Sequence, residues 1–354
     1  MSGAGAALRV SAWPAERGDN EYNHRLTAGL RGRGHRVTDF RLYRPAPRID
    51  VLHLHWPEKV LEHGTPGSVV RLALLALHVE LTRARGGLVV WTAHNAGGHE
   101  GRHPLLRRWL WAHVARRVGL VIHLSPESQE AIERWRPRLA RVPSVVVPEP
   151  WRPVSPPDGA ARDRARAKLG SGPGEVVAVS LGRIRDYKRC EDIVAAFRQS
   201  PGPLRLVLGG RADPAIAERL RHLAEGDDRI ELRLRRLDDD EITELHAAAD
   251  VAVFAFSQIL NTGSVRRALR SGCPVLAPNL TSLRSLADEV GPSLRLVEGP
   301  LAAELARLVT DAPPRPAAIS ADPWAEMAER TEQAYLRRIA ERNRSRCSPR
   351  TKST

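Results

Sequence analysis

The sequence predicts an α/β protein made of two Rossmann-like, doubly wound parallel-sheet domains that face a central cleft. Its 354 residues are 42% hydrophobic, enough for each of two domains to bury a core. Short apolar runs alternate with helical patterns on both sides of a proline cluster between Pro148 and Pro157. Such alternation is typical of βα units in a parallel sheet, and clustered prolines interrupt regular elements.

Residues 1–150 are predicted to form the first domain. Its expected strands are Leu8–Ala12, a strand from Val37 through Leu42, Val51–His55, Gly87–Thr92 and Leu120–Leu124. Its expected helices are Asp19–Gly32, Val69–Arg83 and the basic Leu105–Val118.

A proline-rich linker is expected over residues 151–172, and the alternation restarts in a second domain over residues 173–322. The expected strands are Val176–Leu181, Leu204–Leu208, Ile230–Leu234, Val251–Phe256 and Pro274–Ala277. The expected helices are Cys190–Gln199, Pro214–Glu225, Asp240–Ala249 and Gly263–Ser271. The chain is predicted to finish with a helix over residues 323–340 and a basic disordered tail over residues 341–354.

Composition narrows the classes of protein. The net charge of +14 is spread along the chain, which indicates a solvated basic surface or an anionic partner and disfavours a nucleic-acid-binding protein. Cys190, Cys273 and Cys347 are too far apart for a disulfide framework or a spaced zinc site. No apolar run reaches the length of a membrane span, and the first ten residues lack a signal-peptide pattern, so we expect a cytoplasmic protein.

Two loops of the second domain have residues suited to phosphate. Gly182, Arg183 and Lys188 follow the strand that ends at Leu181, where a glycine permits a sharp turn and the cations suit a diphosphate. Asn261, Thr262, Gly263 and Ser264 precede a predicted helix, whose free N–H groups attract anions. Taken alone, the first loop is equally consistent with cations that face water, and the second is more often a plain helix cap. Their places after strands of one domain favour phosphate binding.

Polar loops also follow strands of the first domain. Asp19 and Asn20 open its first helix, and His53-Leu54-His55-Trp56 ends its third strand. The loop after the next strand holds His94, Asn95, His99 and Glu100 around two glycines, and an imidazole or carboxylate there could remove a proton from a hydroxyl. The acidic run 238–241 is interpreted as a helix cap rather than a metal site. No dinucleotide-binding or P-loop glycine motif occurs.

These motifs together resemble the GT-B glycosyltransferases over most of residues 8–338. The second half carries the segments typical of their donor domain: Gly182-Arg183-Ile184, Tyr187-Lys188, Leu208-Gly209-Gly210, Ala248-Ala249-Asp250-Val251 and Gly272-Cys273-Pro274-Val275. Gly34-His35-Arg36-Val37 and Trp91-Thr92-Ala93-His94-Asn95 match the acceptor half. Within this superfamily, the chain is similar to a bacterial subgroup acting on polysaccharides, glycolipids or natural products.

The resemblance implies a metal-independent hexosyltransferase, without a cofactor, that uses a nucleotide diphosphate sugar and a hydroxyl acceptor. Arg183 and Lys188 would hold the diphosphate, helped by the backbone of residues 261–264. His94 would lie beside the transferred sugar, and an inverting reaction would use Glu100 or His99 as base, with Asp19 in reserve. The other expected substrate-binding residues are Asn20, Trp56 and Asn95.

The sequence departs from the family at one pair of positions. Many retaining members carry two glutamates eight positions apart, where this chain has Ile259 and Arg267. The ribose contact of the second glutamate is therefore expected to be absent or made by another group. A nucleotide-sugar 2-epimerase and a non-catalytic degenerate glycosyltransferase remain as alternatives. The basic helix Leu105–Val118 would either be solvated or contact the anionic inner face of the membrane, where a lipid-linked acceptor would lie.

Overall fold

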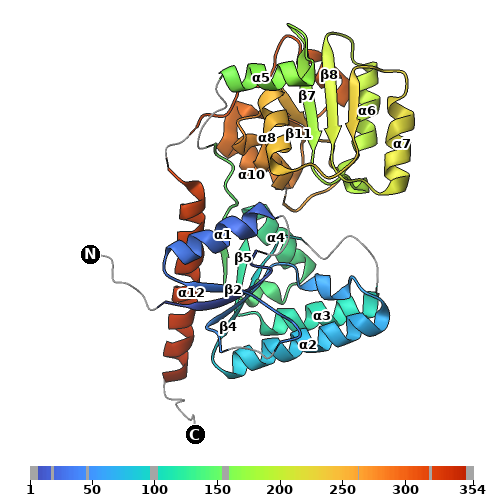
Figure 1. The fold of residues 1–354 in the computed structure, drawn as a ribbon. Helices are drawn as coiled ribbons and strands as arrows, with labels where there is room; N and C mark the ends of the chain where they lie inside the picture. The colour runs from blue at the N-terminus through green and yellow to red at the C-terminus, as the bar shows by residue number, and fades with distance from the viewer. Residues whose placement is uncertain are drawn as a thin grey trace. The chain divides into compact units, whose positions relative to one another are not determined.

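The computed structural model describes residues 7–16, 20–44, 48–95, 103–153, 159–261, 263–318 and 321–347. It divides into unit 1, which is Met1–Glu149 with Trp324–Thr354, and unit 2, which is Pro150–Pro323. Each unit has a six-stranded parallel sheet with helices around it, as Figure 1 shows. The predicted fold class is thereby confirmed. In the described residues, no helix has the length and apolarity needed to cross a membrane.

The sheet of unit 1 has the strand order β2-β1-β3-β4-β5-β6. Its strands are β1 (Arg9–Trp13), β2 (Arg36–Asp39), β3 (Val51–Leu54), β4 (Leu88–Thr92), β5 (Leu120–His123) and β6 (Ser144–Val146). The helices between them are α1 (Glu21–Gly32), α2 (Thr65–Ala84), α3 (Pro104–Arg117) and α4 (Pro126–Trp135), with short 3-10 turns η1 (Pro57–Leu61) and η2 (Leu139–Arg141). Every residue of β3, β4 and β5 is buried, as expected for parallel strands covered on both faces.

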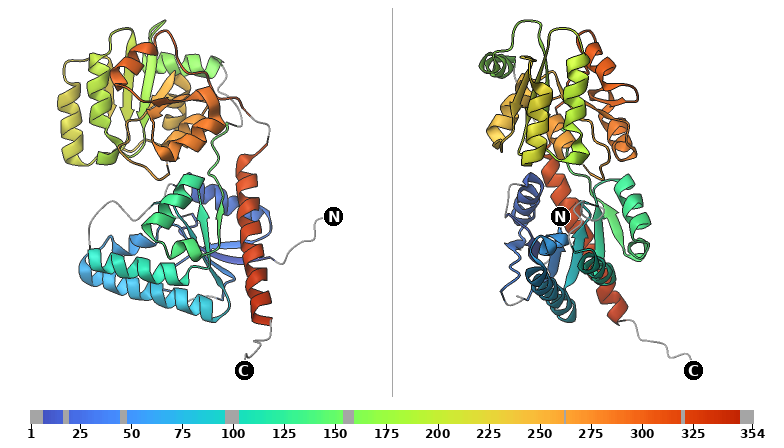
Figure 2. Two further views of the ribbon diagram at one scale, coloured as in Figure 1. Left: turned by 180° about the vertical axis from the view of Figure 1, so that it is seen from behind. Right: turned by 90° about the vertical axis from the view of Figure 1, so that its right-hand side faces the viewer.

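The C-terminal helix α12 (Pro323–Cys347) lies along unit 1, beside strands from the start of the chain (Figure 2). It packs closely on α1, because a Cβ added at Gly29 would come within 2.5 Å of the Ala328 Cβ. The Arg338 Nε and the Arg342 Nη1 donate hydrogen bonds to backbone carbonyls of Gly119 and Gly87, at 2.8 and 2.9 Å. The helix is therefore a structural part of unit 1.

The sheet of unit 2 has the strand order β12-β11-β10-β7-β8-β9. Its strands are β7 (Val176–Leu181), β8 (Leu204–Gly209), β9 (Ile230–Arg233), β10 (Val251–Val253), β11 (Val275–Pro278) and β12 (Leu294–Val297). Its helices are α5 (Gly159–Leu169), α6 (Cys190–Gln199), α7 (Pro214–Ala224), α8 (Asp239–Ala248), α9 (Gly263–Arg270), α10 (Thr281–Val290) and α11 (Leu301–Arg307), with short turns η3 (Asp186–Lys188) and η4 (Gly291–Ser293). The strand order reverses between β7 and β10, and ligands of doubly wound sheets bind at such switch points.

Two segments differ from the prediction. Residues 159–169, within the expected linker, form α5, whose Ala165 and Leu169 join the core of unit 2 while Arg166 pairs with Asp250 at 3.0 Å. Helix α12 continues to Cys347, through the first part of the expected disordered tail. Helix α5 has many charged side chains and buries Ala165 and Leu169, whereas residues 341–345 of α12 have no fully buried side chain. The local pattern of both segments therefore resembled a linker or a tail.

Candidate active site

The strongest candidate for binding an anion lies in unit 2, between the loops after β7 and β10. The Lys188 Nζ donates a hydrogen bond to the Ser264 Oγ at 3.1 Å. Lys188 comes from η3 and is buried, whereas Ser264 is half-buried in the first turn of α9. Because β7 and β10 are neighbours in the sheet, two residues 76 positions apart meet at the switch point.

Glycines create room beside this pair. Gly182 has a φ of +108°, and a Cβ there would lie 3.0 Å from the Ser264 Oγ and 3.1 Å from the Lys188 Nζ. Gly210, after β8, has a φ of +151°, and its added Cβ would meet the Gly182 carbonyl at 2.0 Å. Both positions therefore require glycine. The Gly182 backbone lies beside the Lys188 ammonium and the Ser264 hydroxyl, and we call these three groups together the cradle.

The remaining predicted residues of unit 2 are close in sequence to Gly182 or Ser264. Arg183 follows Gly182 directly and is exposed, so its guanidinium is accessible to a ligand. Asn261 is half-buried, Gly263 is exposed at the start of α9, and Thr262 lies outside the described residues. The Ser257 N–H donates to the Tyr187 carbonyl at 2.9 Å, which joins the two loops directly.

Burial changes the acid–base behaviour of the cradle. It lowers the pKa of Lys188 to about 8, because an ammonium loses hydration in this environment. A diphosphate would stabilise the protonated form by supplying a countercharge. The arrangement thus suits an anionic ligand that accepts hydrogen bonds from a cation, a hydroxyl and a helix N-terminus.

Unit 1 holds a cluster of histidines at the carboxyl ends of β3 and β4. The His55 Nδ1 and the His94 Nε2 lie 3.1 Å apart and share a hydrogen bond. The His94 ring stacks on the Trp56 ring, with centroids 4.3 Å apart, and meets Tyr22 edge-on at 5.0 Å. His53 lies below them, with its ring 4.2 Å from that of His55. Two residues predicted from different loops, Trp56 and His94, are thus in direct contact.

These histidines are neutral at physiological pH. Burial lowers the pKa of His53 and of His94 to about 3, and lowers the pKa of His55 well below its ordinary value. A neutral imidazole donates one hydrogen bond and accepts another, but one with such a low pKa holds a transferred proton poorly. His94 is therefore suited to orient a substrate hydroxyl rather than to act as a base.

A carboxyl group lies beside this cluster. Glu58 is the second residue of η1, and its side chain accepts a hydrogen bond from the Asn95 amide. Burial is the main cause that raises the pKa of Glu58 to about 7, while that hydrogen bond and the charge of Lys59 lower it. The sequence analysis did not single out Glu58, although it follows the His53–Trp56 motif by two residues.

The outcome for the other predicted residues of unit 1 is mixed. Asn20 caps α1, with its Oδ1 accepting from the Asn23 N–H at 3.2 Å, so its side chain already has a structural partner. Asp19, His99 and Glu100 lie outside the described residues.

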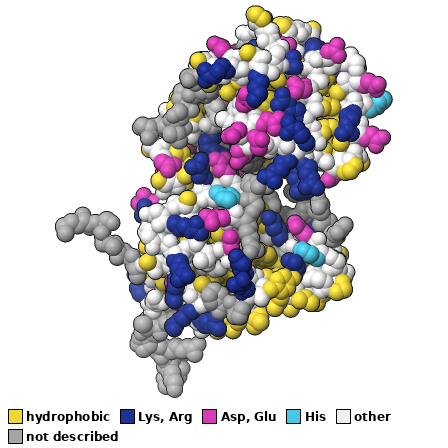
Figure 3. All heavy atoms as spheres, viewed as in Figure 1, with side chains coloured by type: hydrophobic (Ala, Val, Ile, Leu, Met, Phe, Trp, Pro, Cys, Tyr) yellow, Lys and Arg dark blue, Asp and Glu magenta, His cyan; other side chains and the backbone are white. Residues whose placement is uncertain are grey.

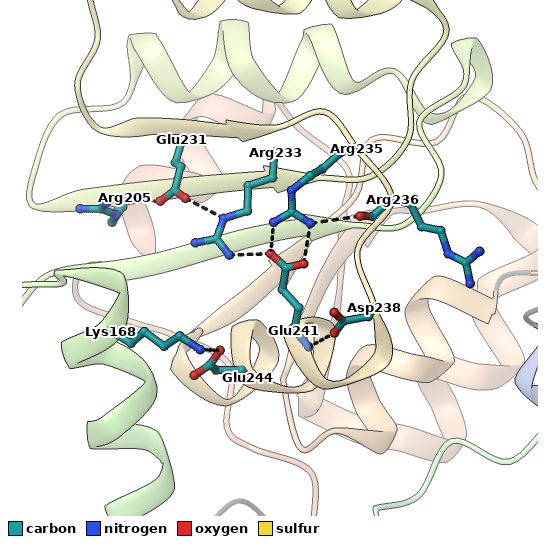
Figure 4. A network of polar contacts seen from close by, with 9 residues as sticks. All are labelled: Lys168, Arg205, Glu231, Arg233, Arg235, Arg236, Asp238, Glu241 and Glu244. Carbon is teal, nitrogen blue, oxygen red and sulfur yellow. Dashed lines mark hydrogen bonds and ion pairs between the residues drawn. The ribbon is translucent and has the colours of Figure 1, made fainter.

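The acidic run in unit 2 is a helix cap, as predicted, and it also has arginine partners. Figure 4 shows Asp238 accepting from the Glu241 N–H at 2.8 Å, while the Glu241 carboxylate binds Arg233 at 3.0 Å and Arg235 at 2.7 Å. Positive partners compensate this carboxylate, so it is a poor metal ligand. Among the described residues, no group of three histidine, cysteine or acidic side chains is placed to hold a metal ion.

Comparisons with known proteins agree with this architecture. No family model matches the chain. The chain is 30% identical over 310 residues to a GDP-mannose:glycolipid 4-beta-D-mannosyltransferase of Xanthomonas campestris pv. campestris, covering 82% of this chain and 80% of that protein. A second protein of the same description, from a named strain of that organism, is 31% identical over the same coverage.

Solved structures show the same fold at low sequence identity. HepE of Anabaena, solved with UDP and glucose, has a TM-score of 0.64 at 14% identity and covers 96% of this chain and 98% of its own. Sucrose-phosphate synthase of Thermosynechococcus elongatus has a TM-score of 0.65 at 17% identity over the same shares. WaaG, a glycosyltransferase of lipopolysaccharide biosynthesis, has a TM-score of 0.61 at 15% identity over 92% of this chain and 95% of its own.

These relatives favour a transferase over the epimerase and non-catalytic alternatives. The identity to the mannosyltransferases extends over most of both chains, and the two six-stranded units match GT-B structures. The chain therefore belongs to the same family as these bacterial mannosyltransferases and is a GT-B hexosyltransferase that uses a nucleotide-sugar donor.

Proposed function

We propose that this enzyme transfers a mannosyl group from GDP-mannose to a hydroxyl of a glycolipid. The observation that carries the proposal is the identity of 30% over 310 residues to an enzyme named for that donor and acceptor. The cradle of Lys188, Ser264 and Gly182 supports it, because its ammonium and hydroxyl suit a diphosphate and the glycine places no side chain beside them. Arg183 and the backbone of residues 261–264 complete the proposed donor site.

We further propose that transfer is independent of a divalent metal. As the sugar leaves, negative charge develops on the terminal phosphate of the nucleotide. The Lys188 ammonium and the exposed Arg183 guanidinium would stabilise that charge, the role a metal ion has in other enzymes. On the acceptor side, His94, Trp56 and Asn95 would orient the sugars, while the roles expected for Asp19, Asn20, His99 and Glu100 stay predictions.

We also propose that unit 1 touches an anionic membrane through α2 and α3, where a glycolipid would be presented. Leu105 is 80% exposed and Trp109 is 48% exposed, both on α3, and α2 adds further exposed apolar side chains, Val69, Val70 and Leu77. Figure 3 shows hydrophobic side chains gathered over these two helices.

Arginines flank this apolar surface. One recess of about 410 Å³ is lined by Pro104 and three arginines, Arg107, Arg108 and Arg136. A second, of about 500 Å³, includes Arg116, Arg138 and Arg141 in its lining. Apolar side chains beside arginines match the acyl boundary and the phosphates of an anionic lipid layer.

The test is transfer from a panel of nucleotide sugars to a mixed glycolipid extract, with and without a chelator. We expect mannosyl transfer from GDP-mannose, and we expect this transfer to continue when the chelator is present. In the absence of acceptor, we expect no epimerisation of the donor sugar. Transfer from another donor alone would overturn the donor assignment. Loss of transfer in the chelator, restored by Mg²⁺, would overturn metal independence and leave the donor assignment intact.

A further inference from the structure

We propose that Glu58 is the catalytic base, the group that takes the proton from the acceptor hydroxyl as the sugar is transferred. This inference rests on the proposed function, because it needs a hydroxyl acceptor and a sugar donor. It concerns a residue outside every site predicted from the sequence.

The position of Glu58 is the first argument. The residue lies in η1, directly after the carboxyl end of β3, and Asn95 lies just beyond the end of β4. These strands are neighbours in the sheet, so the Glu58–Asn95 hydrogen bond bridges two strand ends at the edge where ligands of such sheets bind. The His94–Trp56 stack belongs to the same two loops. Glu58 is thus a carboxyl group hydrogen-bonded to Asn95, in the same two loops that carry the His94–Trp56 stack.

The surrounding groups are the second argument. Asn95 and half-burial hold the carboxyl in place, while His94 belongs to the same strand end and is neutral. The charged groups acting on Glu58 are Lys59, which lowers its pKa, and Glu62, which raises it; together with desolvation they leave the pKa at about 7. A base works best when its pKa is close to the working pH, since it is then both available and able to hold a proton.

Competing groups at this edge are weaker candidates. The pKa of His94 is lowered to about 3 and that of His55 lies well below its ordinary value, so protonated forms of both are costly. Among the described residues of η1 and the β4 end, Glu58 is the titratable group whose pKa lies near neutrality.

The proposed step balances as an inverting displacement. The acceptor oxygen forms a bond to the anomeric carbon while the bond from that carbon to the diphosphate oxygen breaks. The diphosphate leaves with the bonding electron pair, and the hydroxyl proton passes to a Glu58 carboxylate oxygen. After release of products the carboxyl returns its proton to water, and no oxidant, reductant or metal takes part.

The experiment compares Glu58→Gln with Glu62→Gln, which removes the exposed acid four residues further along the same segment. We expect Glu58→Gln to lower kcat by about 100-fold or more while the Kd for GDP stays unchanged. In the wild type, kcat/KM should rise with pH around about 7, and this rise should disappear in Glu58→Gln. It should persist in Glu62→Gln, shifted to slightly lower pH because the charge of Glu62 raises the pKa of Glu58. Glu58→Asp should recover part of the lost rate.

A second measurement separates catalysis from folding. The pKa of Glu58 is about 7 in the folded protein and lower in the unfolded chain, so its carboxylate opposes folding above about pH 7. Glu58→Gln should therefore raise the Tm at about pH 8 relative to the wild type. A variant that fails to fold, or that keeps its rate and pH profile, would overturn the assignment. If the wild type transfers no sugar to any acceptor, the proposed function itself fails, and the assignment falls with it. Wild-type transfer that survives in Glu58→Gln overturns the assignment alone.

Discussion

The Tyr335 hydroxyl lies 2.7 Å from the Nδ1 of His53, so a side chain near the C-terminus contacts one on β3, 282 positions earlier. The other ring nitrogen of His53 lies 2.7 Å from the Thr92 Oγ1, and all three side chains are buried. A neutral imidazole carries one N–H, so it donates to one of these hydroxyls and accepts from the other. Helix α12 thereby contributes a hydrogen bond that holds the His53 ring of the histidine cluster in place.

Replacing Tyr335 with phenylalanine should destabilise unit 1 by about 1–3 kcal/mol, because a buried ring nitrogen of His53 loses its partner. The free energy of unfolding, measured with denaturant, reports the change. Tyr43→Phe is the matched control, since Tyr43 is exposed and its hydroxyl keeps access to water. Equal stability of both variants would mean that the hydrogen bond contributes nothing net.

Replacing Lys188 with methionine should weaken GDP binding by about 10- to 100-fold, because a charge-assisted hydrogen bond to phosphate contributes about 1.5–3 kcal/mol. Titration calorimetry with GDP measures the loss. Lys168→Met serves as the control, because Lys168 lies on α5, is exposed and pairs with Glu244. Unchanged affinity in Lys188→Met would place the diphosphate elsewhere.

GDP binding should also weaken as the pH rises through about 8. The pKa of Lys188 in the free enzyme is about 8, so the ammonium that attracts the diphosphate is present below this pH and is lost above it. Each further pH unit should lower the affinity by up to about tenfold, until the limit set by the neutral amine. Calorimetry between about pH 6.5 and 9.5 reveals the trend, which should be absent in Lys188→Met.

Gly182→Ala should abolish measurable GDP binding, because the new methyl group would enter the space beside Lys188 and Ser264. Gly226→Ala provides a control for backbone strain: its φ is +77°, and a Cβ there meets nothing within 4 Å. Both variants should lose roughly 1–2 kcal/mol of stability from the left-handed backbone. Only Gly182→Ala should lose GDP, and retained binding would contradict the cradle.

Binding to vesicles tests the α2–α3 surface. The double variant Leu105→Glu with Trp109→Glu should reduce sedimentation with phosphatidylglycerol vesicles, because two charges replace apolar side chains beside arginines. Val309→Glu is the control, as an exposed apolar residue of unit 2. If the wild type sediments equally with neutral phosphatidylcholine vesicles and with phosphatidylglycerol vesicles, the arginines contribute nothing to binding. Binding to the anionic vesicles should also weaken in high salt.

The local sequence was enough to predict most elements. Helix α6 and strand β7 begin and end where the apolar pattern placed them, because α6 has one regular buried face and β7 is a short apolar run buried on both faces. The cap interpretation of residues 238–241 also followed from local chemistry, since Asp238 bonds to the N–H three residues later. The linker and tail predictions did worse, because α5 buries only Ala165 and Leu169 among its charges, and residues 341–345 of α12 have no fully buried side chain.

The candidate site was only partly accessible to the sequence. Residue types indicated phosphate at Lys188 and Ser264, and the family resemblance implied a sugar beside His94. Their pairing depends on which strands are neighbours: β7 with β10 in unit 2, and β3 with β4 in unit 1. Sheet order is a property of the whole domain and is not encoded in any one loop.

The sequence by itself determined the two-domain α/β fold, the strand-end loops and the glycosyltransferase resemblance, because these depend on periodicity and on motifs read along the chain. Only the tertiary structure decided which histidines are neutral, that Lys188 titrates near 8, and that Glu58 has a pKa near 7. Each of these properties arises from desolvation by residues distant in sequence, which no local pattern reports.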